Sequence, residues 1–277
     1  MIESLYHFTS IESLVSMLSD YSADNPNFTL WASNALFMND ASEFVYAESV
    51  LKEILQQFEE EEGIDEKEAF AYILNNRKSI FNFDALKDIP FIVSLTETSS
   101  SAALWDIYAK KGCGIALEFD VEDLCKASTC SLKKCLYCRD SSDFLFEPEM
   151  RAILKEIYDY VVKMTPISIG YYPAQAHAVR AYLLLSKFSP IVKNASFAYE
   201  QEHRLFSSSN EVKFRTRGNI ILPYKEIHLP ANIIKKIIIG PCADFEYVAM
   251  SMKLYLASKG LHELSKHIEC SVVPYRG

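Results

Sequence analysis

Residues 89–95 read Ile89-Pro90-Phe91-Ile92-Val93-Ser94-Leu95. The run is short, rich in β-branched side chains and bounded by turns, so it predicts a strand. A second strand is expected at Gly114-Ile115-Ala116-Leu117-Glu118-Phe119. Similar patterns predict further strands at 203–207, 219–228, 233–239 and 268–273.

Helical patterns lie between these strands. Thr9 with Glu12 forms a capping-box pattern, and Asp244 is expected to cap a last helix that Gly260 ends. Other helices are expected at 40–63, 65–80, 101–109, 149–164 and 173–193. No repeat or low-complexity linker divides the chain, so we expect a single α+β domain over residues 1–277, with helical insertions at about 40–81 and 148–193.

Composition excludes several classes of protein. The 277 residues are 49% hydrophobic, which is ample for a core and too much for a disordered chain. The net charge is −9, but the segment from Asp40 to Ala69 alone holds eleven acids and two lysines, so the rest of the chain is neutral. The segment from Lys187 to Lys236 contains nine basic and four acidic residues. Within it Lys213, Arg215 and Arg217 alternate, so they could line a face suited to phosphate. A solvated charged face is the alternative.

Targeting, membrane and metal signals are weak. No basic leader or uninterrupted apolar span is present, and seven cysteines without a disulfide framework predict reduced thiols in the cytoplasm. No G-x-G-x-x-G, Walker A, H-E-x-x-H or G-x-S-x-G pattern occurs. Cys135 and Cys138 have zinc-ligand spacing, but Cys125 and Cys130 do not form a second such pair, and we expect no metal.

Polar residues within apolar strands mark the candidate site. His7 lies between two aromatic residues, where it is either a core histidine or a ligand-binding one. Ser94 ends an apolar strand and can face a cleft, while Tyr108 follows in a short aromatic helix. A turn with a core aromatic pair is the alternative for the latter two.

A late segment, Tyr199-Glu200-Gln201-Glu202-His203-Arg204, carries two carboxylates. If it is a strand, Glu200, Glu202 and Arg204 share one face because side chains alternate. Neighbouring carboxylates repel, so at least one is expected to approach a cation, a sugar hydroxyl or Arg204. A solvated edge strand is the alternative.

Seven segments in order carry a family resemblance: Tyr6-His7-Phe8-Thr9-Ser10, Trp31-Ala32-Ser33, Asn39-Asp40-Ala41-Ser42-Glu43-Phe44, Ser94-Leu95-Thr96-Glu97, Leu104-Trp105-Asp106-Ile107-Tyr108, Gly114-Ile115-Ala116-Leu117-Glu118-Phe119-Asp120 and Tyr199-Glu200-Gln201-Glu202-His203-Arg204. As an ordered set they resemble a bacterial family known as domain of unknown function 2971. The family has no established activity.

A second resemblance concerns chemistry. An early histidine, a central serine strand followed by a tyrosine, and a late E-x-E strand are similar to the signature of the ADP-ribosyltransferase superfamily. The resemblance implies a split, mainly antiparallel sheet whose central cleft holds NAD. It implies that His7 bonds a ribose hydroxyl, and that either Tyr108 stacks on nicotinamide or Ser94 supports the neighbouring glutamate. It also implies that Glu202 bonds the ribose 2′-hydroxyl and that Glu200 orients the acceptor. Separately from the resemblance, a local basic group of Arg204 with Arg215 or Arg217 could meet the pyrophosphate.

Three functions follow from these patterns. The first is an ADP-ribosyltransferase-like enzyme that uses NAD as a substrate, without a metal, to modify a protein or nucleic-acid acceptor; by analogy, it would be a toxin or a phage-defence protein. The second is a metal-dependent nuclease or hydrolase using Glu200, Glu202 and His203, although His203 should lie on the opposite strand face. The third is a non-catalytic module whose acidic segment binds a basic partner.

Overall fold

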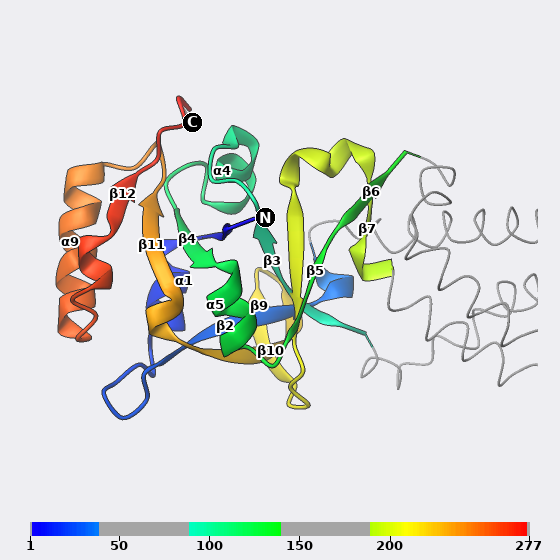
Figure 1. Cartoon of the computed structure of the whole chain (residues 1–277), viewed down its shortest axis with the longest axis horizontal. Helices are drawn as coiled ribbons and strands as arrows, with labels where there is room; N and C mark the ends of the chain where they lie inside the picture. The colour runs from blue at the N-terminus through cyan, green and yellow to red at the C-terminus, as the bar shows by residue number, and fades with distance from the viewer. Residues whose placement is uncertain (1, 39–88, 140–188, 276–277) are drawn as a thin grey trace, which may run out of the picture. The chain divides into compact units, whose positions relative to one another are not determined.

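The computed structural model describes residues 2–38, 89–139 and 189–275. The chain divides into two compact units, unit one at 1–34, 91–135 and 199–277, and unit two at 35–90 and 136–198. The described residues have a mixed α+β fold with a mainly antiparallel sheet (Figure 1), so these two features of the predicted fold are confirmed. The acidic segment, the helices expected at 40–63, 65–80 and 149–164, and nearly all of both expected insertions lie outside the described residues.

Unit one is built on one large sheet. In the described part of the chain its strand order is β12-β11-β4-β1-β3-β2-β10-β9, and β8 pairs with both β3 and β5. Neighbouring strands are antiparallel except β11 and β12, which are parallel. The strands are β1 (Ser4–Thr9), β2 (Asn27–Asn34), β3 (Phe91–Thr96), β4 (Ile115–Asp120), β5 (Ser131–Lys134), β8 (Glu202–Phe206), β9 (Lys213–Arg217), β10 (Ile220–Pro230), β11 (Ile234–Ile239) and β12 (Ile268–Cys270).

The two faces of this sheet pack against different helices. Alternate strand residues such as Leu5, Leu95 and Leu205 belong to a large core that also includes residues of α1 (Ile11–Met17), α5 (Val121–Ala127) and α9 (Phe245–Ser258). Figure 1 shows α9 beside β11 and β12. We call this side the α9 face.

The opposite side is the α4 face. Phe8, Ala116 and Ile238 point there and pack against α4 (Ala102–Tyr108). The fully buried Trp105 of α4 meets Phe8 edge to face, with ring centroids 4.8 Å apart. Because side chains alternate along a strand, and directly paired residues share a face, each strand residue can be assigned to one of these two sides.

Helix caps follow the local sequence closely. Ser101 and Asp244 cap α4 and α9, and Asp244 Oδ1 accepts a hydrogen bond from the backbone N–H of Tyr247 at 3.2 Å. Gly260 has a φ of 79°, which permits the left-handed turn after α9. The predicted cap at Thr9 is one residue early, because the Oγ of Ser10 accepts from Ser13 N–H at 3.1 Å and Thr9 still belongs to β1.

Several elements differ from the sequence expectations. The helix predicted at 173–193 is wrong at its described end, where η4 (Ser189–Ile191) and β7 (Val192–Asn194) replace it. Pro190 explains the change, since proline lacks the N–H that a helix interior needs. In unit two, β7 pairs in parallel with β6 (Leu136–Cys138). The remaining described 3₁₀ turns are η1 (Ala35–Phe37), η5 (Ala195–Glu200), η6 (Ala231–Ile233) and η7 (Leu264–Lys266).

Several strands were not among those predicted, including β1, β2 and β9. β1 and β2 both lie inside the sheet, and β2 alternates buried Phe28, Leu30 and Ala32 with half-buried Thr29 and Trp31. The last predicted strand is shorter than expected and ends at Cys270, after which the chain turns so that Val273 joins the core beneath α4. None of the helices in the described segments is long and apolar enough to cross a membrane.

Candidate functional site

The two glutamates of the E-x-E segment enter unit one through a backbone kink. Glu200 ends η5, Glu202 begins β8, and Gln201 between them has a φ of +46°. Both glutamate side chains are buried, with about 4% of each residue exposed. The prediction that Glu200, Glu202 and Arg204 lie along one strand is therefore right only for the last two. A non-glycine residue in the left-handed region is energetically unfavourable and is more common at functional sites than elsewhere.

Glu202 forms an internal ion pair with Arg204 on the α4 face. Arg204 Nε donates to Glu202 Oε1 at 3.0 Å, and Arg204 Nη2 donates to Glu202 Oε2 at 3.1 Å. The thiol of Cys135 also contacts Glu202 Oε2, at 3.6 Å. Arg204 is only 1% exposed. This two-point geometry is the strongest pairing of a guanidinium with a carboxylate, and it confirms that one carboxylate of the segment is drawn to Arg204.

Glu200 is bound to α4. The hydroxyl of Tyr108, at the end of that helix, donates to Glu200 Oε1 at 2.9 Å. The Thr96 hydroxyl donates to the backbone carbonyl of Glu200 at 2.5 Å, which anchors the kink to β3. Tyr108 is 36% exposed, so this hydrogen bond joins a buried carboxylate to the molecular surface.

Ser94 lies on the same face as these groups. It pairs directly with Arg204 across β3 and β8, while Thr96 pairs with Glu202. The structure thus brings together five of the six site residues expected from the sequence: Ser94, Tyr108, Glu200, Glu202 and Arg204. We call these five residues the α4-face cluster.

His7 does not join this cluster. Tyr6 pairs with Thr96, which puts His7 beside Leu95 on the α9 face, across the sheet from Glu202. Its Nδ1 contacts the backbone carbonyl of Ser94 at 3.0 Å. Burial lowers the pKa of His7, and the hydrogen bond to Ser94 opposes this shift only in part. The expectation that His7 converges with Glu202 is therefore corrected, and the geometry agrees with the alternative of a core histidine.

The α9 face carries a separate ionic group. His203 Nε2 and Lys134 Nζ both approach Glu97 Oε1, at 2.8 and 2.7 Å. Burial raises the pKa of Glu97, but the hydrogen bonds from Lys134 and His203 outweigh it, and the net pKa is lowered. The expected placement of His203 on the opposite strand face is confirmed for Glu202, whereas Glu200 lies outside the strand. Glu97 was not recognised as its partner, because sequence alone does not reveal the register of β3 against β8.

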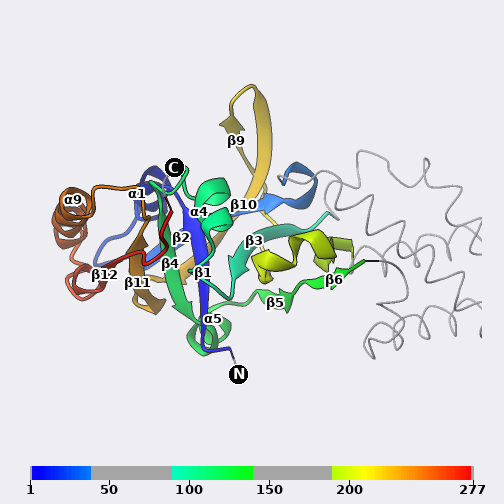
Figure 2. The same ribbon diagram turned by 90° about the horizontal axis from the view of Figure 1, so that it is seen from above.

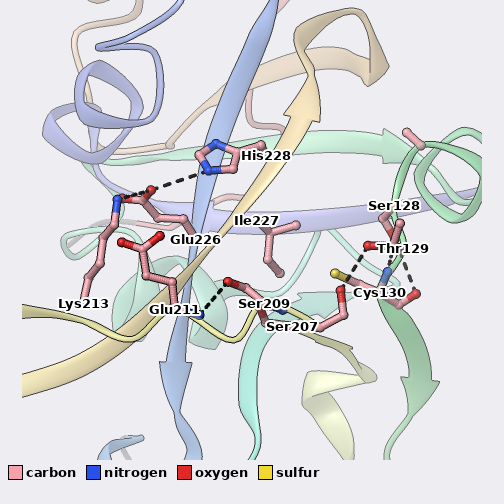
Figure 3. A pocket seen from close by; sticks show the side chains of 12 residues that line it. Ser128, Thr129, Cys130, Ser207, Ser209, Glu211, Lys213, Glu226, Ile227 and His228 are labelled. Atoms are coloured by element: carbon pink, nitrogen blue, oxygen red, sulfur yellow. Dashed lines mark hydrogen bonds and ion pairs between the residues drawn. The ribbon is translucent and has the colours of Figure 1, made fainter.

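A pocket lies at the other end of the sheet, near β9 and β10. It has a volume of about 430 Å³. Figure 3 shows hydroxyl side chains from the loops at 127–130 and 207–209, and the charged residues Glu211, Lys213 and Glu226. Lys213 Nζ lies 2.7 Å from Glu226 Oε2, so the basic group of this pocket is already paired.

The cysteines make no metal centre in the part of the chain that is described. Cys125 is exposed, whereas Cys135 and Cys138 are buried. No group of three or more histidine, cysteine, aspartate or glutamate residues is placed to hold a metal ion among residues 2–38, 89–139 and 189–275.

Comparison with known families supports the resemblance seen in the motifs. Residues 104–205 match the model of a family described as Protein of unknown function (DUF2971). Four members of the α4-face cluster, Tyr108, Glu200, Glu202 and Arg204, fall within this match. No curated protein and no solved structure matches the chain.

Proposed function

We propose that the chain is an ADP-ribosyltransferase-like enzyme that uses NAD as its substrate, with its reaction centre at the α4-face cluster. The observation that carries this proposal is the kink at Gln201, which brings two buried carboxylates to the same side of the sheet beside Tyr108. Arg204 and Tyr108 offset the cost of burying these two acids, but the strained backbone at Gln201 has a further cost, which a functional role would explain.

The chemistry suits this group of residues. Cleavage breaks the C1′–N bond between ribose and nicotinamide; nicotinamide leaves as a neutral molecule with the bonding electrons, and C1′ develops oxocarbenium character. A nucleophile on the acceptor then bonds to C1′ and loses its proton. A fixed carboxylate near the sugar stabilises the positive charge, as in glycoside hydrolysis, and the reaction requires no metal.

Each residue has a separate role in this scheme. Glu202, held in one orientation by Arg204, is assigned to the ribose 2′-hydroxyl. Glu200 is assigned to the acceptor, because its bond to the partly exposed Tyr108 leads to the surface. Tyr108 supplies a ring for nicotinamide, and Ser94 supports the ion pair from the neighbouring strand. His7 has no role, since it lies across the sheet.

The proposed location in the cell rests on the cysteines. Seven cysteines without a disulfide framework in the sequence favour a reducing compartment such as the bacterial cytoplasm. There the acceptor is a protein or a nucleic acid.

Labelled NAD tests the proposal directly. Nicotinamide release and label transfer are measured for the wild type, Glu202→Gln, Glu200→Gln and Tyr108→Phe, with a cell extract as the acceptor source. Loss of a transition-state contact at Glu202 should lower the rate by roughly 10²–10³-fold. Glu97→Gln, a carboxylate substitution on the α9 face, should keep wild-type activity.

Folding of each variant is checked by circular dichroism and thermal unfolding. If Glu202→Gln does not fold, Glu200→Gln and Tyr108→Phe still decide the question, because neither breaks the Glu202–Arg204 pair. Equal rates in the wild type and these variants, or no nicotinamide release by the wild type, would overturn the proposal.

A further inference from the structure

A second arginine on the α4 face lies against two neighbouring aromatic rings. The guanidinium carbon of Arg215, on β9, lies 5.0 Å from the ring centre of Trp31 and 5.7 Å from that of Tyr224. The two rings belong to β2 and β10 and are 5.4 Å apart, tilted by 49°. Figure 2 shows that the β9–β10 hairpin projects away from the rest of the sheet of unit one.

Arg215 has few internal partners. Its Nη2 donates to Ser33 Oγ at 3.1 Å, the one hydrogen bond that its side chain makes with the described residues. Its Nε is buried and has no hydrogen-bond partner there, and no described carboxylate pairs with it. Burial lowers the pKa of Arg215, and the charge of nearby Arg217 lowers it further.

This arrangement is costly for the folded chain by itself. An arginine stays charged at any physiological pH, so its desolvation is not relieved by losing a proton. Cation–π contacts offset part of the cost. Lys213, two residues earlier on the same side of β9, shows the usual solution, since it pairs with Glu226.

We propose that Arg215, with Ser33, Trp31 and Tyr224, forms a binding site for the phosphate group of a nucleotide. The planar guanidinium offers N–H groups in the fork geometry that phosphate accepts, and Arg217 adds a second positive charge on the same side of β9. The two half-buried rings beside it provide an aromatic surface for a base. The proposal does not depend on NAD cleavage, because it concerns binding at β9 and uses no residue of the α4-face cluster.

Trp31 makes the site measurable. The chain has two tryptophans, and Trp105, which belongs to α4, is fully buried. A change of fluorescence on titration should therefore come from Trp31. The full chain is titrated with AMP, adenosine, inorganic phosphate and acetate, and each affinity is confirmed by calorimetry. We expect AMP to bind more tightly than phosphate, phosphate more tightly than adenosine, and acetate to bind least.

Variants then locate the site. Arg215→Gln should weaken AMP binding by roughly tenfold or more, because a charge-assisted contact is lost. Trp31→Leu should reduce the preference for AMP over phosphate, with calorimetry as the readout. Lys235→Gln is the matched control, because it also removes one positive charge. Lys235 lies on β11 and forms an exposed ion pair with Asp123 of α5.

The outcomes separate the alternatives. Equal AMP affinity in the wild type and Arg215→Gln, with both proteins folded by thermal unfolding, would overturn the proposal. The proposed site is also rejected if adenosine or acetate binds as tightly as AMP, or if the wild type shows no response to AMP. A loss in Lys235→Gln as large as that in Arg215→Gln would show a general charge effect and would likewise reject the site.

Discussion

Arg204 and Arg215 lie on the same face of one sheet, yet they are stabilised in opposite ways. Arg204 is 1% exposed and meets both carboxylate oxygens of Glu202. Arg215 is half-buried against Trp31 and Tyr224 and donates a single hydrogen bond to Ser33 among the described residues. One guanidinium thus has its partner within the chain, while the other has an aromatic setting without a described counter-charge.

The difference separates the positioning role proposed for Arg204 from the binding role proposed for Arg215. A buried ion pair holds its members in one geometry, so Arg204 fixes where the Glu202 carboxylate points. An arginine such as Arg215, whose described hydrogen-bond partner is a neutral hydroxyl, retains N–H groups that an anion from solution can accept. Measurements of the free energy of unfolding test whether the two arginines also differ in their contribution to stability.

The largest effect is expected for Arg204→Leu. Removing the guanidinium leaves the buried Glu202 carboxylate without its cation, which should lower the free energy of unfolding by about 3–5 kcal/mol. Urea unfolding at neutral pH measures the change. Lys126→Gln, which breaks the exposed pair of Lys126 with Glu122, serves as the control and should have no measurable effect. A loss below about 1 kcal/mol for Arg204→Leu would contradict an essential internal pair.

Parts of this fold could be predicted from local sequence, since their causes are local. The strands of residues 91–96 and 234–239 are runs of apolar, largely β-branched residues, and Asp244 and Gly260 limit α9 by capping and by backbone freedom. β2 was not predicted as a strand, although Phe28, Leu30 and Ala32 alternate in it. The alternation specifies a strand only once β2 pairs with β3 and β10, which local sequence does not reveal.

The candidate site could be predicted only in part, because it depends on register. Glu202 and Arg204 share a face through simple alternation within β8, which sequence reasoning can follow. The side of the sheet that His7 occupies depends on how β1 pairs with β3, about 90 residues away in sequence. The kink at Gln201 is equally hidden, since glutamine has no preference for positive φ.

His7 provides the intermediate case, because it is a half-buried ionisable group that contacts the neutral backbone carbonyl of Ser94. Because burial lowers the pKa of His7 below 6.5, the unfolded chain binds its proton more readily than the folded chain does. The stability from this group is therefore complete above about pH 6.5 and falls as the pH drops toward the lowered pKa. We expect this pH-dependent loss in the free energy of unfolding to be smaller than the loss caused by Arg204→Leu.

Urea unfolding at several values from about pH 8 to about pH 5 measures this dependence in the wild type and in His7→Gln. The variant should lose less stability than the wild type over the acid half of this range. His228→Gln, which removes an exposed histidine, should keep the wild-type slope. Identical slopes for the wild type and His7→Gln would show that His7 titrates normally in the folded protein.

The smallest effect is expected for Arg215→Leu. The substitution removes two cation–π contacts, each worth about 0.5–1 kcal/mol, but it also removes a desolvated charge without a described carboxylate partner. These terms oppose each other, so the free energy of unfolding should change by less than about 1 kcal/mol. Urea unfolding alongside Arg204→Leu measures it under the same conditions. A loss similar to that of Arg204→Leu would mean that Arg215 is itself a structural residue, and the contrast between the two arginines would then be one of geometry alone.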